Sequence, residues 1–412
     1  MIHTSLSPNT TLKDIFIAKS YIFFPWKWLS IRHGKYVHQI EEKFKKYLPI
    51  KHAVSFDSGR SALYAILKAM NVQKGDEIIL QAYTCVVVPN AIIHAGAVPI
   101  YADIEKDSLN IDQNDLEKKI TPKTKAIIIQ NTFGAIADYE KIQTIANKHK
   151  LKIIEDCAHS LGAEFKNKKI GTIGDAAMFS FGRDKVISAV YGGMAVTNNP
   201  EIGKNLKKFQ QDLSYQSYKK IYSHLLHPII FAISLPLYNF LHLGKIMILF
   251  FQKINLLSKA LIQEEKKGKF PKSQPSCFPN ALAEIACNQM KNLDKFNKHR
   301  KNIADFYQQE LSESILRTPK VNKSSKNIYL RFTIFISQRD ELMRLAAKQH
   351  IYLGDWYDNV IAPKNVDFES VFYQKGSCKN AEKRALESIN LPTHIHITLK
   401  KAEKIIDFLK NN

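Results

Sequence analysis

A single lysine stands in an apolar stretch of the chain, "MFSFGRDKVISAVYGGMAV", at residues 178–196. Lys185 lies there between a Ser-Phe-Gly turn and the pair Gly192-Gly193. A lysine among apolar side chains shifts toward its neutral form and becomes a nucleophile, because burial disfavours the charged amine. A lysine in an exposed surface loop is the commoner alternative. Taken alone, the stretch leaves both interpretations open.

A pair of carboxylates forms a second candidate group, in "LKIIEDCAH" at residues 151–159. Glu155 and Asp156 come directly after an apolar run that predicts a strand, which puts them at its carboxyl end. A buried carboxylate needs a cationic or N–H partner. Asp156 therefore either caps the next turn or serves a ligand, and a protonated pyridine nitrogen is one cation that would suit it.

A glycine turn opens a third candidate, "SFDSGRSALYAILKAM", at residues 55–70. Ser58 and Gly59 lead the chain from a strand into a helix, whose free N–H groups and positive dipole end can hold a phosphate. Arg60 and Ser61 could add further donors. The alternative is a plain helix cap, in which Ser58 satisfies the first amides.

The three groups together predict one kind of site. Phosphate donors, a carboxylate at a strand end and an isolated lysine are what a pyridoxal phosphate site requires. In such a site the lysine forms a Schiff base with the cofactor, and the carboxylate keeps the pyridine nitrogen protonated so that the ring can accept electrons. The helix N-terminus would hold the phosphate group.

These groups need a scaffold that brings strand ends together, and the pattern from residue 37 to residue 200 predicts one. Short apolar strands such as "HAVSF" and "DEIILQAY" alternate there with amphipathic helices such as "DYEKIQTIANKHK". This alternation predicts an α/β fold with a three-layer, mostly parallel sheet flanked by helices. Ligands of such sheets bind beyond the carboxyl ends of the strands.

Composition along the chain divides it into four parts. We expect an N-terminal arm over 1–36, a large cofactor-binding domain over 37–205, an apolar helical insertion over 206–272 and a smaller α+β domain over 273–412. One long helix, "PNALAEIACNQMKNLDKFNKHRKNIADFYQQEL", is expected near the start of the smaller domain.

The insertion contains an uncharged run at residues 221–244, followed by Lys245 and "IMILFF". Its length would suit a transmembrane helix, but Pro228 and Pro236 interrupt it, and an internal span would split one enzyme across a bilayer. Three interpretations of residues 221–251 remain: buried core helices, a subunit interface, or a hairpin at a membrane surface.

The 412-residue chain has a net charge of +22, from 60 Lys and Arg against 38 Asp and Glu. The excess consists mostly of dispersed lysines, without an Arg-rich stripe or zinc-finger spacing, which argues against a nucleic-acid partner. The five cysteines include no CxxC pair. We therefore expect no disulfide framework, no metal site and a reducing, cytoplasmic location.

Several ordered segments resemble one enzyme family. "SGRSALYAIL", "IEDCAHSLGAEF" and "GDAAMFSFGRDKVISAVYGGMAVTNN" look like the phosphate turn, the Glu-Asp segment and the lysine segment of the DegT/StrS family of nucleotide-sugar aminotransferases. "HIYLGDWYDNVIAP" and "INLPTHIHIT" stand where that family has its Gly-Ile and Leu-Pro motifs. The resemblance implies a fold-type I pyridoxal phosphate enzyme similar to aspartate aminotransferase, with a smaller C-terminal α+β domain.

The resemblance also implies roles for individual residues. Lys185 would be the Schiff-base lysine that also moves the reacting proton, and Asp156 would pair with the pyridine nitrogen. The other cofactor contacts that it implies are His159 at the ring or its 3′-oxygen, Tyr83 stacked on the pyridine, and the phosphate donors Gly59, Arg60, Ser61 and Ser180. The resemblance assigns nothing to Arg183 and Asp184.

The implied reaction moves an amino group from an amino acid, with glutamate as the expected donor, to a keto group of a nucleotide-activated sugar. The implied pathway is the synthesis of cell-surface polysaccharide or glycoconjugate, in a cytoplasmic homodimer with the active site at the interface. "QPSCFPNAL" departs from the family pattern that supplies a partner-subunit contact. A lipid-linked or membrane-associated substrate, with peripheral membrane contact through 221–251, and a non-catalytic regulator are the alternatives.

Overall fold

The computed structural model describes residues 1–259, 261–312, 314 and 316–412. Its centre is a seven-stranded sheet, and all strands but β11 run in one direction. The strands, in spatial order, are β2 (His52–Phe56), β11 (Gly193–Thr197), β10 (Ala176–Ser180), β7 (Lys152–Asp156), β6 (Thr124–Gln130), β3 (Glu77–Gln81) and β5 (Val98–Ala102). The predicted mostly parallel sheet is confirmed.

Helices cover both faces of this sheet, because the strands bury apolar side chains on both sides. In β3, Ile79 joins one hydrophobic cluster while Ile78 and Leu80 join the other, as the two-residue period of a strand dictates. One cluster contains side chains of α3 (Lys35–Tyr47), α7 (Tyr139–His149) and α11 (Asn280–Lys291), and the other those of α4 (Gly59–Ala69), α5 (Val87–His94) and α8 (Pro200–Gln211).

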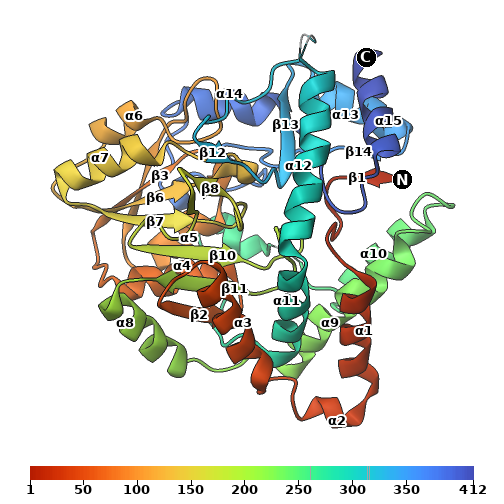
Figure 1. Ribbon diagram of the computed structural model, residues 1–412, viewed down its shortest axis with the longest axis horizontal. Coiled ribbons are helices and arrows are strands. Elements are labelled where there is room, and N and C mark those ends of the chain that lie inside the picture. Colours follow the sequence, from red (N-terminus) through yellow and green to blue (C-terminus); the bar gives the residue numbers. More distant parts are fainter. Residues whose placement is uncertain (260, 313, 315) are drawn as a thin grey trace.

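The C-terminal part forms its own small core at the top of Figure 1. There β13 (Arg331–Phe335) pairs antiparallel with β16 (Ser388–Pro392). The helices of this part are α12 (Leu293–Glu310), α13 (Arg339–Lys348), α14 (Lys379–Glu387) and α15 (Leu399–Lys410). The single long helix expected here is wrong: α11 and α12 meet at Asn292, whose ψ of 2° leaves the helical range and whose side chain donates to the Asn288 carbonyl.

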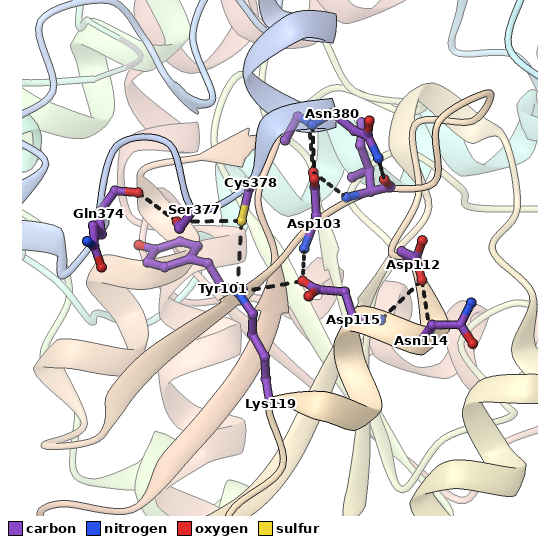
Figure 2. Close-up of polar contacts among 12 residues, drawn as sticks. Tyr101, Asp103, Asp112, Asn114, Asp115, Lys119, Gln374, Ser377, Cys378 and Asn380 are labelled. Carbon is purple, nitrogen blue, oxygen red and sulfur yellow. Dashed lines mark hydrogen bonds and ion pairs between the residues drawn. The ribbon is translucent and has the colours of Figure 1, made fainter.

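A polar junction ties α14 to the edge of the sheet (Figure 2). The carboxylate of Asp103, which follows β5, accepts hydrogen bonds from the backbone N–H groups of Asn380 and Ala381 at 2.9 and 2.8 Å. It thereby caps the N-terminus of α14 from a distant part of the chain, where a negative charge is favoured. The C-terminal elements are thus fixed against the strands that lead into the site.

Short elements complete the described structure. They are β1 (Ile2–His3), which pairs with β14 (Ile351–Tyr352); β4 (Thr84–Cys85), which pairs with β15 (Ile361–Ala362); the sheet of β8 (Glu164–Phe165), β9 (Lys168–Lys169) and β12 (Ser325–Lys326); α6 (Gln113–Lys118); and the 3₁₀ turns η1 (Thr132–Gly134), η2 (Gln263–Lys267) and η3 (Glu369–Val371).

The N-terminal helices and the apolar insertion pack together at the lower right of Figure 1. α9 (Tyr218–Ser234) contacts both α1 (Leu12–Phe23) and α10 (Leu243–Lys253), and α2 (Pro25–Trp28) follows α1. The inner face of α9 joins the main core, whereas much of α10 is exposed. Within the described residues, no helix has the length and apolar character needed to cross a bilayer.

Candidate active site

A cavity of about 250 Å³ opens at the carboxyl ends of β7 and β10 and the N-terminus of α4. This volume lies just below the range of roughly 300–1,000 Å³ that is typical of small-molecule sites. The cavity is lined by most of the residues singled out from the sequence: Gly59, Arg60, Asp156, His159, Ser180 and Lys185. Segments more than 120 residues apart in the chain thus meet here, as the strand-end rule predicts.

Lys185 and His159 form the polar centre of the cavity. The backbone N–H of Phe133 donates to His159 Nδ1 at 3.2 Å, so a neutral imidazole carries its proton on Nε2. That nitrogen lies 2.9 Å from Lys185 Nζ, where it can donate to the lone pair of a neutral amine. Burial lowers the pKa of both groups, and the charge of nearby Arg331 lowers both further. Burial thus makes Lys185 easier to deprotonate than an exposed lysine, and the deprotonated amine is the nucleophilic form.

Asp156, the last residue of β7, lines the same cavity as Lys185. Burial raises the pKa of its carboxyl, and two weaker influences oppose this: a hydrogen bond of 3.0 Å from the Ala158 N–H to Oδ1 and the charge of Lys185. A buried carboxylate with a raised pKa gains from a cation beside it. Glu155, in contrast, points away into a set of backbone N–H donors from Gly171, Ile173 and Gly174 and has a structural role.

The N-terminus of α4 forms a narrow cradle next to β10. A Cβ atom placed on Gly59 would lie only 2.8 Å from Ser180 Cβ, so this approach requires glycine. Ser58 caps the helix by accepting from the Ser61 N–H at 3.2 Å, and the two hydroxyls lie 2.8 Å apart. Ser61 is buried and does not line the cavity, whereas Arg60 does and forms an ion pair with Glu265 of the insertion.

The structure does not bring Tyr83 to the cavity. Its φ of 62° turns the chain before β4, and its buried ring packs edge-on against Tyr357 and Phe133, at centroid distances of 5.3 and 6.4 Å. Cys85, two residues later, lines the cavity instead. The turn at Tyr83 cannot be recognised from the sequence, because a tyrosine in the left-handed region of φ is uncommon.

Comparison with known proteins shows which family the chain belongs to. The family model described as "DegT/DnrJ/EryC1/StrS aminotransferase family" matches residues 26–235 and 276–410. The chain belongs to this family. The expected aminotransferase class and the pyridoxal phosphate cofactor are thereby confirmed. Residues 236–275, which contain α10, lie outside the matched ranges.

Relatives of this aminotransferase act on activated sugars according to their names. "GDP-perosamine synthase" of Vibrio cholerae is 29% identical over 318 residues, covering 77% of this chain and 73% of that protein. "dTDP-3-amino-3,6-dideoxy-alpha-D-galactopyranose transaminase" of Aneurinibacillus thermoaerophilus is 27% identical and covers 91% and 89%. Among solved structures, the "putative sugar aminotransferase Spr1654" of Streptococcus pneumoniae superposes with a TM-score of 0.77 at 19% identity, covering 100% and 98%.

The residues of the aminotransferase cavity fit pyridoxal phosphate on structural grounds. The missing Cβ of Gly59 lets Ser180 lie against the N-terminus of α4, where a phosphate would find hydroxyl and N–H donors together. The lowered pKa of Lys185 suits attack on an aldehyde, and the buried Asp156 carboxyl suits a pyridinium nitrogen. When bound, the cofactor supplies an electron sink for the reacting carbon.

Arg331, which sequence reasoning missed, faces these residues from the C-terminal part. It begins β13, is 7% exposed and lines the cavity. Its Nη2 lies 3.5 Å from Ser5 Oγ and 4.0 Å from Asp184 Oδ2, while among the described residues none accepts a hydrogen bond from the buried Nη1. No spacing in the sequence connects Arg331 with Lys185, because the small domain alone sets their proximity.

The structure also places the two residues that the resemblance left unassigned. Arg183 donates to the backbone carbonyl and the hydroxyl of Ser258 in the insertion. Asp184 accepts from the N–H of Ser7 at 3.3 Å and faces Arg331. The loop that carries Lys185 is therefore held between the insertion on one side and the N-terminal segment on the other.

Proposed function

We propose that this enzyme transfers the amino group of an amino acid, with glutamate as the expected donor, to a keto group of a nucleotide-activated sugar that enters cell-surface polysaccharide or glycoconjugate synthesis. The observation that carries the chemistry is the buried Lys185 amine, 2.9 Å from His159 Nε2 in a cavity that also contains Asp156. The names of the relatives support the substrate class.

Each residue of the site has a proposed task. Lys185 Nζ carries the cofactor and moves the proton at the reacting carbon, and His159 orients this amine and contacts the cofactor ring. Asp156 pairs with the pyridine nitrogen. Gly59 and Ser180, together with the backbone of Arg60, bind the phosphate at the N-terminus of α4.

Arg331 is the proposed binding group for the donor's carboxylate. A guanidinium offers two parallel N–H donors, and a carboxylate accepts them in a bidentate pair. The Nη1 of Arg331 is buried beside the cavity that contains Lys185, and the described residues leave it without an acceptor. An amino acid held there would present its amino group to the centre of the cavity.

A screen of keto-sugar nucleotides with glutamate tests the substrate class, read out as the consumption of glutamate. The proposal predicts turnover with at least one hexose derivative that carries a nucleoside diphosphate. Turnover with free keto sugars or with lipid-linked sugars, and none with nucleotide sugars, would contradict it.

The assembly and location are further proposals. We expect a homodimer with the active site at its interface, in the four-part organisation set out above, and a cytoplasmic enzyme with peripheral membrane contact through residues 221–251. The unpaired state of all five cysteines agrees with a reducing compartment. Sedimentation of the purified enzyme measures the dimer, and a monomer at working concentration would contradict that part.

A further inference from the structure

An exposed apolar face covers the helices that flank α9. Phe16 on α1, Trp26 on α2 and Leu29 just after α2 are 75%, 70% and 91% exposed. On α10 and in the loop before it, Leu241, Ile246 and Phe250 are 75%, 57% and 55% exposed. We call these six side chains the apolar face. Single exposed apolar residues are ordinary on a protein surface, whereas several large ones on helices that pack against the same helix, α9, indicate an interaction site.

The helices of this face are amphipathic, and their outer sides are the apolar ones. In α1, Leu12, Phe16 and Phe23 recur at helical spacing and are exposed, whereas Ile17 and Tyr21 are buried. Their inner sides already pack against α9 and α11, so the protein's own core does not need the outer residues. Figure 1 shows α1, α2 and α10 along one side of the molecule, away from the central sheet.

The charges within the two segments that carry the face are positive, and one of them, Lys27 on α2, forms an ion pair with Glu284 of α11. No Asp or Glu occurs in residues 15–40 or 213–263, although 38 of the 412 residues of the chain are acidic. Lys19 on α1 and Lys245 and Lys253 on α10 are exposed. Both segments of the face therefore combine exposed aromatic residues with lysines and lack acidic groups.

We propose that this face docks on the surface of an anionic lipid bilayer. Interfacial helices bury an apolar stripe at the level of the headgroups, where tryptophan is favoured, while flanking lysines bind anionic lipids. The contact is peripheral, since the described helices cannot cross a membrane. This inference rests on the peripheral membrane contact proposed above and deepens it, by naming anionic lipid as the ligand and adding α1 and α2 to the surface, and vesicle binding tests it separately from the reaction.

A second copy of the chain is the less suitable occupant. A two-fold interface places a patch against itself. The exposed lysines of the face would then approach one another, and residues 15–40 and 213–263 contain no carboxylate to pair with them. The nearby carboxylates are already engaged, because Glu284 pairs with Lys27 and Asp14 is buried. Lipid headgroups supply the missing negative charge, so charge complementarity favours the bilayer.

The docked face would lie close to the active-site loop. His224 of α9 and Arg183 both contact Ser258, His224 through a hydrogen bond of 2.9 Å, and Leu261 lines the cavity. The insertion that carries half of the face is thus continuous with the wall of the site.

Flotation of the full-length enzyme with vesicles tests the proposal. We expect binding to vesicles of phosphatidylcholine mixed with phosphatidylserine, and weak binding to phosphatidylcholine alone. The double variant Trp26→Ala/Phe250→Ala should bind about tenfold or more weakly. Lys245→Gln/Lys253→Gln should weaken binding to the anionic vesicles by roughly 30-fold, and Lys245→Arg/Lys253→Arg should restore it.

Two controls test whether a loss of vesicle binding arises from removing any exposed apolar side chains or from misfolding. Leu386→Ala/Leu399→Ala removes two side chains of comparable exposure, 67% and 56%, from the small domain and should leave vesicle binding unchanged. Cofactor absorbance reports folding for every variant. Equal binding by Trp26→Ala/Phe250→Ala and wild type would overturn the proposal. So would dissociation of a lipid-free dimer caused by that variant, because a second copy would then cover the face.

Discussion

Replacing Arg331 by glutamine separates two effects of this guanidinium. Arg331 is the proposed partner of the donor's carboxylate, and its charge also lowers the pKa of Lys185 and His159. The fold should tolerate the change, because the other contacts of Arg331 are weak: a 3.5 Å contact to Ser5, a 4.0 Å ion pair with Asp184, whose side chain is 36% exposed, and a position 5.7 Å from the centre of the Phe133 ring.

The expected decrease in kcat/KM follows from the hydrogen bonds that Arg331 would make to the donor's carboxylate. Charge-assisted hydrogen bonds contribute roughly 1.5–3 kcal/mol each, so losing one should lower kcat/KM for glutamate by about 10- to 150-fold. The half-reaction with the keto-sugar nucleotide should change little. Without the positive charge, the pKa of Lys185 rises, so the rate of cofactor uptake by the apoenzyme should reach its plateau at a higher pH than in wild type.

Arg331→Lys is the matched control, since lysine keeps the charge but not the planar fork. Its cofactor uptake should follow the wild-type pH profile while its kcat/KM for glutamate stays reduced. Stopped-flow absorbance measures the two half-reactions separately. An unchanged kcat/KM for glutamate in Arg331→Gln, or a loss confined to the sugar half-reaction, would refute the assignment.

Two further substitutions test the residues that are proposed to bind the cofactor. Asp156→Asn should abolish most turnover while the cofactor still binds. Because burial raises the pKa of Asp156, the free energy of unfolding of the wild-type apoenzyme should fall as pH rises through that pKa. Thermal melts at several pH values should show that this loss is absent from the variant. Gly59→Ala should lower cofactor affinity about tenfold or more by forcing a Cβ to within 2.8 Å of Ser180 Cβ, as cofactor titration would measure, and wild-type affinity would contradict the cradle.

Local sequence patterns were sufficient to predict part of the candidate active site. Gly59, Asp156 and Ser180 each stand where a strand ends or a helix begins, and Lys185 lies in the loop after β10. A parallel sheet brings such points together whatever the rest of the chain does. The sheet was equally predictable, because apolar strands alternate with helices from β2 to β7.

Other features depended on tertiary packing that no local pattern encodes. Arg331 reaches the cavity only because the small domain packs over the sheet, and Tyr83 leaves it because the backbone turns at that residue. The break at Asn292 depends on one dihedral angle within a strongly helical sequence. The apolar insertion was recognised, but its packing against α1 became visible only in the structure.

The central claim is that Lys185 carries the cofactor. The most direct test reduces the purified enzyme with borohydride, digests it and locates the added cofactor mass by peptide mass spectrometry. The account predicts a single modified peptide, with the mass on Lys185, and loss of the cofactor's visible absorbance on reduction. Modification of another lysine, or an unmodified Lys185 in an enzyme that still turns over, would contradict the account.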